Sequence, residues 1–131
     1  MSNNFLCPYC RNYLNVGENV VFSTRNRIGK EGIIMLHPKL GDYSVIKHPT
    51  FRIGKGELVD FFCPFCNKKL VSDRNPNLAK VLMLDEKDTE YEIHFSRIAG
   101  QHSTYKIIGK AVEIFGEDAA DYFDFLNTGN M

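Results

Sequence analysis

Apolar residues occur in short runs that are separated by polar segments containing glycine or proline. Four runs rich in β-branched and aromatic residues cover 18–24, 33–37, 43–48 and 58–62. Runs of this length and composition, bounded by turn-forming residues, are typical of β-strands. We therefore expect an antiparallel meander in the first half of the chain.

The second half predicts a hairpin, a further strand and one helix. Residues 79–86 and 89–97 flank a polar turn, and 89–97 alternates, with Tyr91, Ile93 and Phe95 on one face. Such alternation predicts a strand that is half buried in a sheet. Residues 103–109 read as another strand, and 110–116 fits a strand or a helix.

Residues 117–126 carry the clearest helical pattern. Acidic residues open the segment, where they favour the positive end of a helix dipole. An apolar stripe follows at helical spacing, formed by Ala119, Tyr122, Phe123 and Leu126. The predicted class is therefore α+β, mainly antiparallel β, with one C-terminal helix. The polar segment 71–78 suggests a division into 1–75 and 76–131, although both parts could fold as one cooperative unit.

All four cysteines lie in two similar stretches, FLCPYCRNYL (5–14) and FFCPFCNKKL (61–70). The stretches match at a constant offset of 56 residues in the pattern F-x-C-P-[FY]-C-x-x-x-L. A C-x-x-C turn directs two sulfurs at one ion, and four thiolates suit the tetrahedral preference of zinc. The predicted metal ligands are Cys7, Cys10, Cys63 and Cys66.

This paired C-P-x-C arrangement resembles zinc ribbons and, more loosely, rubredoxin-type knuckles. The resemblance implies two knuckles that meet around one structural ion, with a sheet connecting them and a zinc-ribbon-like module over residues 1–75. Zinc is the expected metal, and iron fits the same four-thiolate site. Such knuckles place glycine after the second cysteine, whereas Arg11 and Asn67 stand there in this chain. Asn12 offers an alternative residue for the left-handed turn of the first knuckle.

The tetrapeptide CPYC is also the active-site sequence of glutaredoxins, which makes a thiol–disulfide oxidoreductase the alternative function. A thioredoxin-like fold needs a strand before this motif and a long helix after it. Only six residues precede Cys7, and no sustained helical stripe follows Cys10. The second, matching pair favours a metal site and a non-enzymatic protein.

Charge is divided unevenly along the chain. Residues 1–84 hold 12 basic and 6 acidic residues, whereas 85–131 hold 4 and 10. Basic side chains position phosphates and aromatic ones stack bases, so nucleic acid is one candidate partner. A protein partner is the other. The candidate nucleic-acid or anion contacts are Arg11, Arg25, Arg27, Lys30, Arg52, Lys55, Lys68 and Lys69.

Three further features are weaker. RIGK occurs at 27–30 and 52–55, but neither copy has the remaining residues of a phosphate-binding P-loop. His37 and His48 sit at expected strand ends where antiparallel strands could bring them together. The polar segment 96–104 would be the choice for an anion-binding or catalytic loop.

Membrane association is not expected. The first residues lack the basic and apolar regions of a signal peptide, and no apolar run approaches the length needed to span a bilayer. We therefore expect a cytoplasmic protein.

Overall fold

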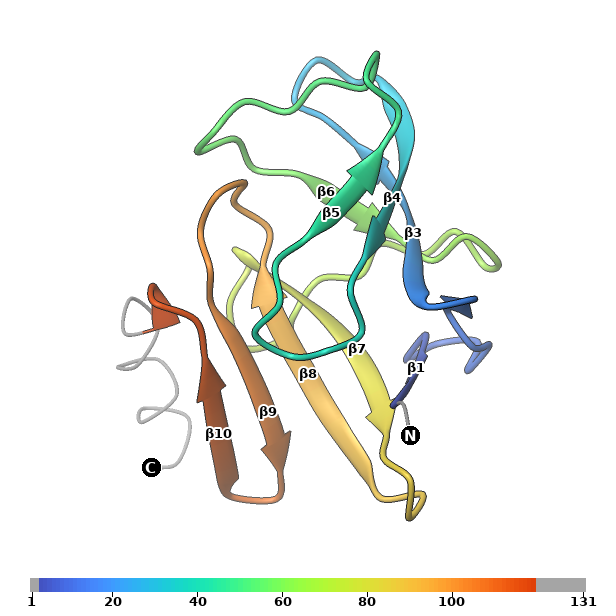
Figure 1. Cartoon of the computed structure of the whole chain (residues 1–131), viewed down its shortest axis with the longest axis vertical. Helices are drawn as coiled ribbons and strands as arrows, with labels where there is room; N and C mark the ends of the chain where they lie inside the picture. The colour runs from blue at the N-terminus through green and yellow to red at the C-terminus, as the bar shows by residue number, and fades with distance from the viewer. Residues whose placement is uncertain (1–2, 120–131) are drawn as a thin grey trace.

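The computed structural model describes residues 3–119, which form ten strands in two five-stranded antiparallel sheets (Figure 1). Sheet A has the order β1 (Asn4–Leu6), β7 (Leu78–Leu84), β8 (Glu90–Ser96), β9 (Thr104–Ile108) and β10 (Ala111–Phe115). Sheet B consists of β2 (Asn15–Val16), β3 (Asn19–Arg25), β4 (Glu31–Leu36) and β5 (Val45–Lys47), with β6 (Asp60–Phe62) also paired to β3.

The predicted α+β class is wrong, because the described residues contain only strands, turns and a single 3₁₀ residue, Ala119. The acidic residues Glu117 and Asp118 lie in a turn after β10. The rest of the predicted helix, residues 120–126, lies outside the described residues. Within 3–119, no helix is long and apolar enough to cross a membrane.

The predicted strands of both halves are present. β3, β4 and β5 form the expected meander, whereas the fourth predicted strand, β6, pairs with β3 and not with β5. The expected hairpin is β7 with β8, which pair along their whole lengths. The ambiguous segment 110–116 forms a strand, β10, paired to β9. The proposed division at residue 75 stays a prediction.

The main core lies between the two sheets. Alternating residues of β3 are buried, and Phe22 is nearly inaccessible to solvent. Its ring contacts Phe61 of β6 and Phe95 of β8, with ring centroids 5.4 Å and 5.7 Å away. Phe61 and Phe95 also meet edge to face at 5.2 Å. Aromatic side chains from both sheets therefore hold the layers together.

The chain crosses between the sheets through the two cysteine knuckles. β1 belongs to sheet A and is followed by the first knuckle, which leads into β2 of sheet B. β6 belongs to sheet B and is followed by the second knuckle, which leads back towards β7 of sheet A. Both crossings lie on one side of the molecule, on the right in Figure 1.

A buried arginine makes a second connection between the sheets. Arg97 follows β8, and its guanidinium donates to the carbonyl oxygens of Val59 and Pro76 and to the carboxylate of Asp60 on β6. Its side chain is only 5% exposed. Burial of this charge is tolerable because each contact is a hydrogen bond and Asp60 supplies the opposite charge.

We predict that Gly32→Ala destabilises the fold. The Cβ of an alanine on β4 would lie 2.5 Å from Cγ of Phe51, whose ring is buried against the strand. Such overpacking costs about 1–3 kcal/mol of unfolding free energy. Urea unfolding measures the difference. Gly54→Ala is the matched control, since its Cβ meets nothing closer than 3.7 Å. Equal stability of the two variants would contradict this prediction.

Candidate metal centre

Each knuckle is a short turn closed by backbone hydrogen bonds, and the two turns repeat each other bond for bond. In the first, Arg11 N–H donates to the Cys7 carbonyl at 2.9 Å; in the second, Asn67 N–H donates to the Cys63 carbonyl at the same distance. The hydrogen bonds that flank the two turns also match, because Leu14 N–H donates to the Phe5 carbonyl and Leu70 N–H donates to the Phe61 carbonyl. The 56-residue repeat in the sequence is therefore a repeat in three dimensions.

The four cysteine sulfurs converge to one point. All four Sγ atoms lie within 4.8 Å of one another. Across the knuckles, Cys7 Sγ lies 3.7 Å from Cys66 Sγ, and Cys10 Sγ lies 3.7 Å from Cys63 Sγ. Four sulfurs bound tetrahedrally at about 2.3 Å from an ion are about 3.8 Å apart. The donor set and its spacing therefore fit a tetrahedral metal ion.

Backbone amides point at the first sulfur of each pair. Tyr9 N–H and Cys10 N–H donate to Cys7 Sγ at 3.3 Å and 3.5 Å. The corresponding amides, of Phe65 and Cys66, donate to Cys63 Sγ at the same distances. These N–H dipoles stabilise negative charge on sulfur. In the first knuckle, the Asn12 side-chain amide also donates to Cys10 Sγ at 3.4 Å.

The residue after each second cysteine takes the left-handed conformation, as the resemblance to metal knuckles implies. Arg11 has φ of 61° and Asn67 has φ of 65°. Arg11 therefore makes the turn itself, and the alternative of a turn at Asn12 is wrong. A non-glycine residue is strained in this conformation. The Arg11 guanidinium forms an ion pair with the carboxylate of Glu90, the first residue of β8, with an N–O distance of 2.6 Å.

The pKa values of the thiols differ because the thiols differ in burial and in the hydrogen bonds that they accept. Burial raises the pKa of the Cys7 thiol and raises that of Cys63 to about 12. The backbone N–H of Asn12 lowers the pKa of the Cys10 thiol to about 7. Four clustered thiolates need a cation to balance their charge, so a metal would displace protons from the buried pair as it binds.

The predicted basic contacts divide into two groups, and the loops that carry the larger group contact each other, since the Asn26 side-chain amide donates to the Arg52 carbonyl. Arg11, Lys68 and Lys69 lie near the knuckles, whereas the other five lie in or beside the loops of sheet B at residues 25–31 and 51–57. Several already have partners within the chain: Arg11 contacts Glu90, Arg25 contacts Glu31, and Lys69 contacts Asp60. Their role as nucleic-acid contacts stays a prediction.

The two candidate histidines are not brought together. The register of β4 and β5 pairs Leu36 with Val45 and Ile34 with Lys47, so His37 and His48 lie at opposite ends of this strand pair. His37 Nδ1 accepts from Lys39 N–H, and His48 Nδ1 contacts the Thr50 hydroxyl. Within the described residues, the cysteines are the only group of three or more metal-ligand side chains close enough to share an ion.

In the 96–104 segment, no nucleophilic side chain is paired with a side chain that could act as its general base. Arg97 is buried in the contact between the sheets, so it is not available to an external anion. The Ser96 hydroxyl donates to the Gln101 side chain at 2.7 Å, and the ring of His102 stacks on Tyr43 with centroids 4.4 Å apart. The segment instead forms one edge of a cavity between the sheets.

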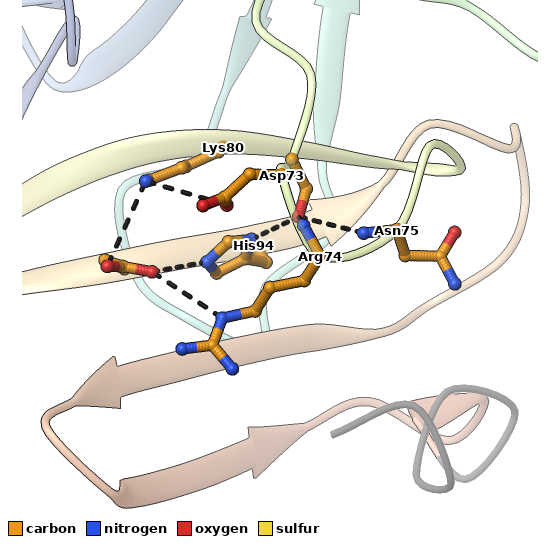
Figure 2. Close-up of polar contacts among 7 residues, drawn as sticks. Asp73, Arg74, Asn75, Lys80 and His94 are labelled. Atoms are coloured by element: carbon orange, nitrogen blue, oxygen red, sulfur yellow. Dashed lines mark hydrogen bonds and ion pairs between the residues drawn. The ribbon is translucent and has the colours of Figure 1, made fainter. Parts of the chain in front are cut away.

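A buried Ser–His–Glu chain was not expected from the sequence. On the outer face of sheet A, His94 is fully buried, its Nδ1 lies 2.8 Å from Ser72 Oγ, and its Nε2 lies 2.9 Å from Glu92 Oε1 (Figure 2). Ser72 Oγ also accepts from Arg74 N–H and Asn75 N–H. Because its lone pairs are taken, the serine hydroxyl donates to His94, which donates to Glu92.

This chain of hydrogen bonds holds the 72–77 segment against sheet A and is not a catalytic site. His94 and Ser72 are covered, so no substrate can reach the hydroxyl. Arg74 and Lys80 surround the Glu92 carboxylate at 3.9 Å, and Lys80 also lies 3.8 Å from Asp73 (Figure 2). The alternation of 89–97 puts His94 on the face opposite Tyr91, Ile93 and Phe95. The sequence does not show that this histidine is buried, because its contact is with the distant Ser72.

Comparison of the chain with protein-family models, with curated proteins and with solved structures found no match. The site is therefore described by its own geometry: four sulfurs, two repeated turns and both crossings between the sheets.

We predict that His94 weakens the fold as the pH falls. Burial lowers the pKa of His94 below its ordinary value of 6.5. Below that value the unfolded chain binds a proton that the folded chain does not, so this histidine stabilises the fold above about pH 6.5 and less below it. An NMR titration of the imidazole should give a midpoint under 6.5.

Urea unfolding of the wild type and of His94→Gln at about pH 7.5 and 5.5 supplies the second measurement. The two proteins share the cysteine cluster, so acid release of a metal cancels in the difference. The difference in unfolding free energy between the wild type and His94→Gln should be smaller at the lower pH. A larger difference there, or a midpoint above the ordinary value, would show that the imidazole is stabilised in its charged form.

Proposed function

We propose that this protein is a small non-enzymatic binding module held together by one structural zinc ion. The observation that supports the proposal is the position of the four sulfurs. They close a tetrahedral set at the place where the chain crosses between its two sheets in both directions. A metal there links both crossings, so its binding energy is also folding energy.

Zinc is preferred over other metals because of the ligands. Four cysteine sulfurs are soft donors, and a tetrahedral set of four fills the coordination sphere of zinc. Catalytic zinc normally keeps one position open for water or substrate, which four protein sulfurs do not leave. Iron suits the same four sulfurs and is the alternative ion.

The proposed contact surface is the knuckle face, formed by Tyr9, Tyr13, Phe65, Arg11 and Lys68. Tyr9 and Phe65 occupy equivalent positions in the two knuckles and are 53% and 62% exposed. Lys68 Nζ lies 5.3 Å from the centre of the Tyr9 ring. Exposed aromatic side chains with arginine nearby are enriched at protein interfaces.

A protein partner is favoured over nucleic acid by the local charge balance. Arg11 and Lys69, beside the knuckles, already contact the carboxylates of Glu90 and Asp60. Phosphate binding relies on cations that can release counterions to solvent, and paired cations supply less of this effect. The aromatic rings remain accessible to either kind of partner.

The surroundings of CPYC do not favour the oxidoreductase alternative. The first pair lies between strands β1 and β2, whereas a thioredoxin-like motif begins a helix. Cys7 and Cys10 sulfurs each contact a sulfur of the second pair at 3.7 Å. A metal held by all four would leave the CPYC thiols unavailable for disulfide exchange.

We predict one zinc ion per chain in the purified protein, measured by elemental analysis. Cys63→Ser should lose both the metal and the cooperative unfolding transition, because removal of one ligand opens the crossing between the sheets. Cys10→Ser provides the second variant. Cys10 is partly exposed, so its substitution removes a ligand with little loss of buried packing.

Comparable loss of stability in both cysteine variants, reproduced by a chelator on the wild type, supports a structural metal. A metal-free protein that remains folded and reduces disulfides through Cys7 would instead establish the oxidoreductase. Iron in place of zinc would change the ion but not the structural role.

We predict that the knuckle face is the partner-binding surface. A photo-crosslinking amino acid in place of Tyr9 or Phe65 should trap a discrete partner in cells. The same amino acid in place of Ile28, which is 81% exposed in the β3–β4 turn, is the control. Digestion of the product by protease or by nuclease identifies the class of partner. Equal products from Ile28 would contradict the assignment of the surface.

A further inference from the structure

The space between the two sheets is only partly filled. A cavity of about 300 Å³ lies there, bounded by sheet B on one side and by sheet A on the other. Phe22 and Ile34 contribute from sheet B, and Val81 and Ile93 from sheet A. Protein interiors normally contain few voids larger than a water molecule. A space equal to about ten water volumes is therefore a feature that packing alone does not explain.

The cavity is apolar inside and opens at one edge. Leu36, Leu40 and Ile53 pack against the main core but remain partly exposed, and they line the opening. Two segments form its rim, the 37–43 connection between β4 and β5 and the 98–102 connection between β8 and β9. In Figure 1 the β8–β9 connection lies across the molecule from the knuckles. The rim of the cavity thus lies away from the knuckle face, whereas Phe5 and Phe61, which flank the knuckles, form part of its inner wall.

Most polar side chains at the rim already have partners. The Tyr43 hydroxyl contacts Thr104 Oγ1 at 2.8 Å, and the Asp42 carboxylate accepts from the Ser44 hydroxyl at 2.6 Å. Arg97 is bound to Asp60 as described above. These groups stabilise the walls and leave little hydrogen-bonding capacity for a ligand.

Two lysines are the exceptions. Lys47 and Lys39 both line the cavity, and neither has a carboxylate within 4.0 Å in the described part of the chain. Lys47 faces inward on the edge strand β5, beside Ile34 of β4. Its Nζ donates one hydrogen bond, to the Phe51 carbonyl at 2.7 Å. An ammonium group has three donors, so two remain for a ligand.

The charged lining residues are therefore mainly basic, while most of the wall is apolar. Asp42 is the single acidic residue among the lining residues, and His37 lies 3.7 Å from it. Ligand sites typically combine apolar walls with a few placed polar groups, and this cavity is at the small end of their volume range. Its ligand should carry one anionic group on a compact hydrocarbon body.

We propose that this cavity binds a medium-chain aliphatic carboxylate, with its chain between the sheets and its carboxylate on Lys47. At about 30 Å³ per heavy atom, the cavity accommodates a chain of about ten atoms. The proposal goes beyond the metal-stabilised partner binding described above, because it assigns a small ligand to a different part of the molecule.

The test is calorimetric titration of decanoate into the full-length, metal-loaded protein, with hexanoate, hexadecanoate and decanol as comparisons. Decanoate should bind saturably and more tightly than the shorter or the longer acid. Decanol should bind about tenfold more weakly, because it cannot form the charge-assisted hydrogen bonds. No saturable decanoate binding to folded, metal-loaded protein would overturn the proposal. Equal binding of decanol would overturn the assignment of the head group.

Lys47→Met tests the head-group contact, since it keeps the aliphatic stem and removes the charge. It should weaken decanoate binding about tenfold and leave decanol unchanged. Lys110→Met, in the exposed β9–β10 turn, is the matched control and should change neither. A loss of decanoate binding in both variants would point to general surface charge and overturn the assigned contact.

Leu36→Trp tests the location of the chain, because the larger side chain would fill the cavity from its partly exposed edge. Ile33→Trp is the control, since Ile33 is half exposed on β4 and does not line the cavity. Only Leu36→Trp should abolish binding. If that variant fails to fold, the NMR methyl shifts of Leu36, Leu40 and Ile53 on addition of decanoate locate the chain in the wild type. Unmoved methyl signals alongside heat of binding would overturn the proposal.

Discussion

Convergence of four sulfurs at the two crossings between the sheets is the constraint on which the rest of the structure depends. Each knuckle ends one strand in one sheet and begins the path to a strand in the other. With both crossings bound at a single point, the sheets are fixed relative to each other at that side. The core of Phe22, Phe61 and Phe95 then fills the space next to it. A chain of this size buries little surface, so one such link is a large part of its stability.

The same constraint accounts for the asymmetry of the interior. Near the knuckles, Phe5, Leu14, Phe61 and Leu70 are buried in the main core together with Cys7 and Cys63. Away from them, the sheets are connected by Arg97 with Asp60 and by side chains of the rim, such as Tyr43 with Thr104. The apolar cavity opens beside these contacts, and its inner wall includes the core residues Phe22, Phe61 and Phe95. The two proposed binding regions thus differ in character: exposed aromatic side chains on the knuckles, and a partly open apolar cavity between the sheets.

The cysteine cluster could be predicted from the sequence because its information is local and repeated. A C-P-x-C turn, its flanking Phe and Leu, and the 56-residue offset identify both halves of the site without any knowledge of the fold. Most strands were also readable from their composition. The predicted helix at 117–126 was wrong where the structure describes it, because Glu117 and Asp118 instead turn the chain after β10, with Asp118 bonded to His102. The periodicity of apolar residues along a segment predicts which of its faces is apolar, but it does not predict contacts with distant parts of the chain. The burial of His94 could not be predicted for the same reason, since its cover comes from Ser72, 22 residues away.

The separation of the two knuckles along the chain also determines the order in which the molecule can assemble. The hairpins β3–β4 and β7–β8 pair neighbouring segments and can form early, whereas the sulfur cluster joins residues 56 positions apart and carries a larger loop-closure cost. During synthesis the N-terminal pair, Cys7 and Cys10, leaves the ribosome long before Cys63 and Cys66 exist. Until then it is an exposed dithiol with half of a coordination sphere. The protein is therefore most open to oxidation, or to capture of a wrong metal, in the interval before its second knuckle emerges.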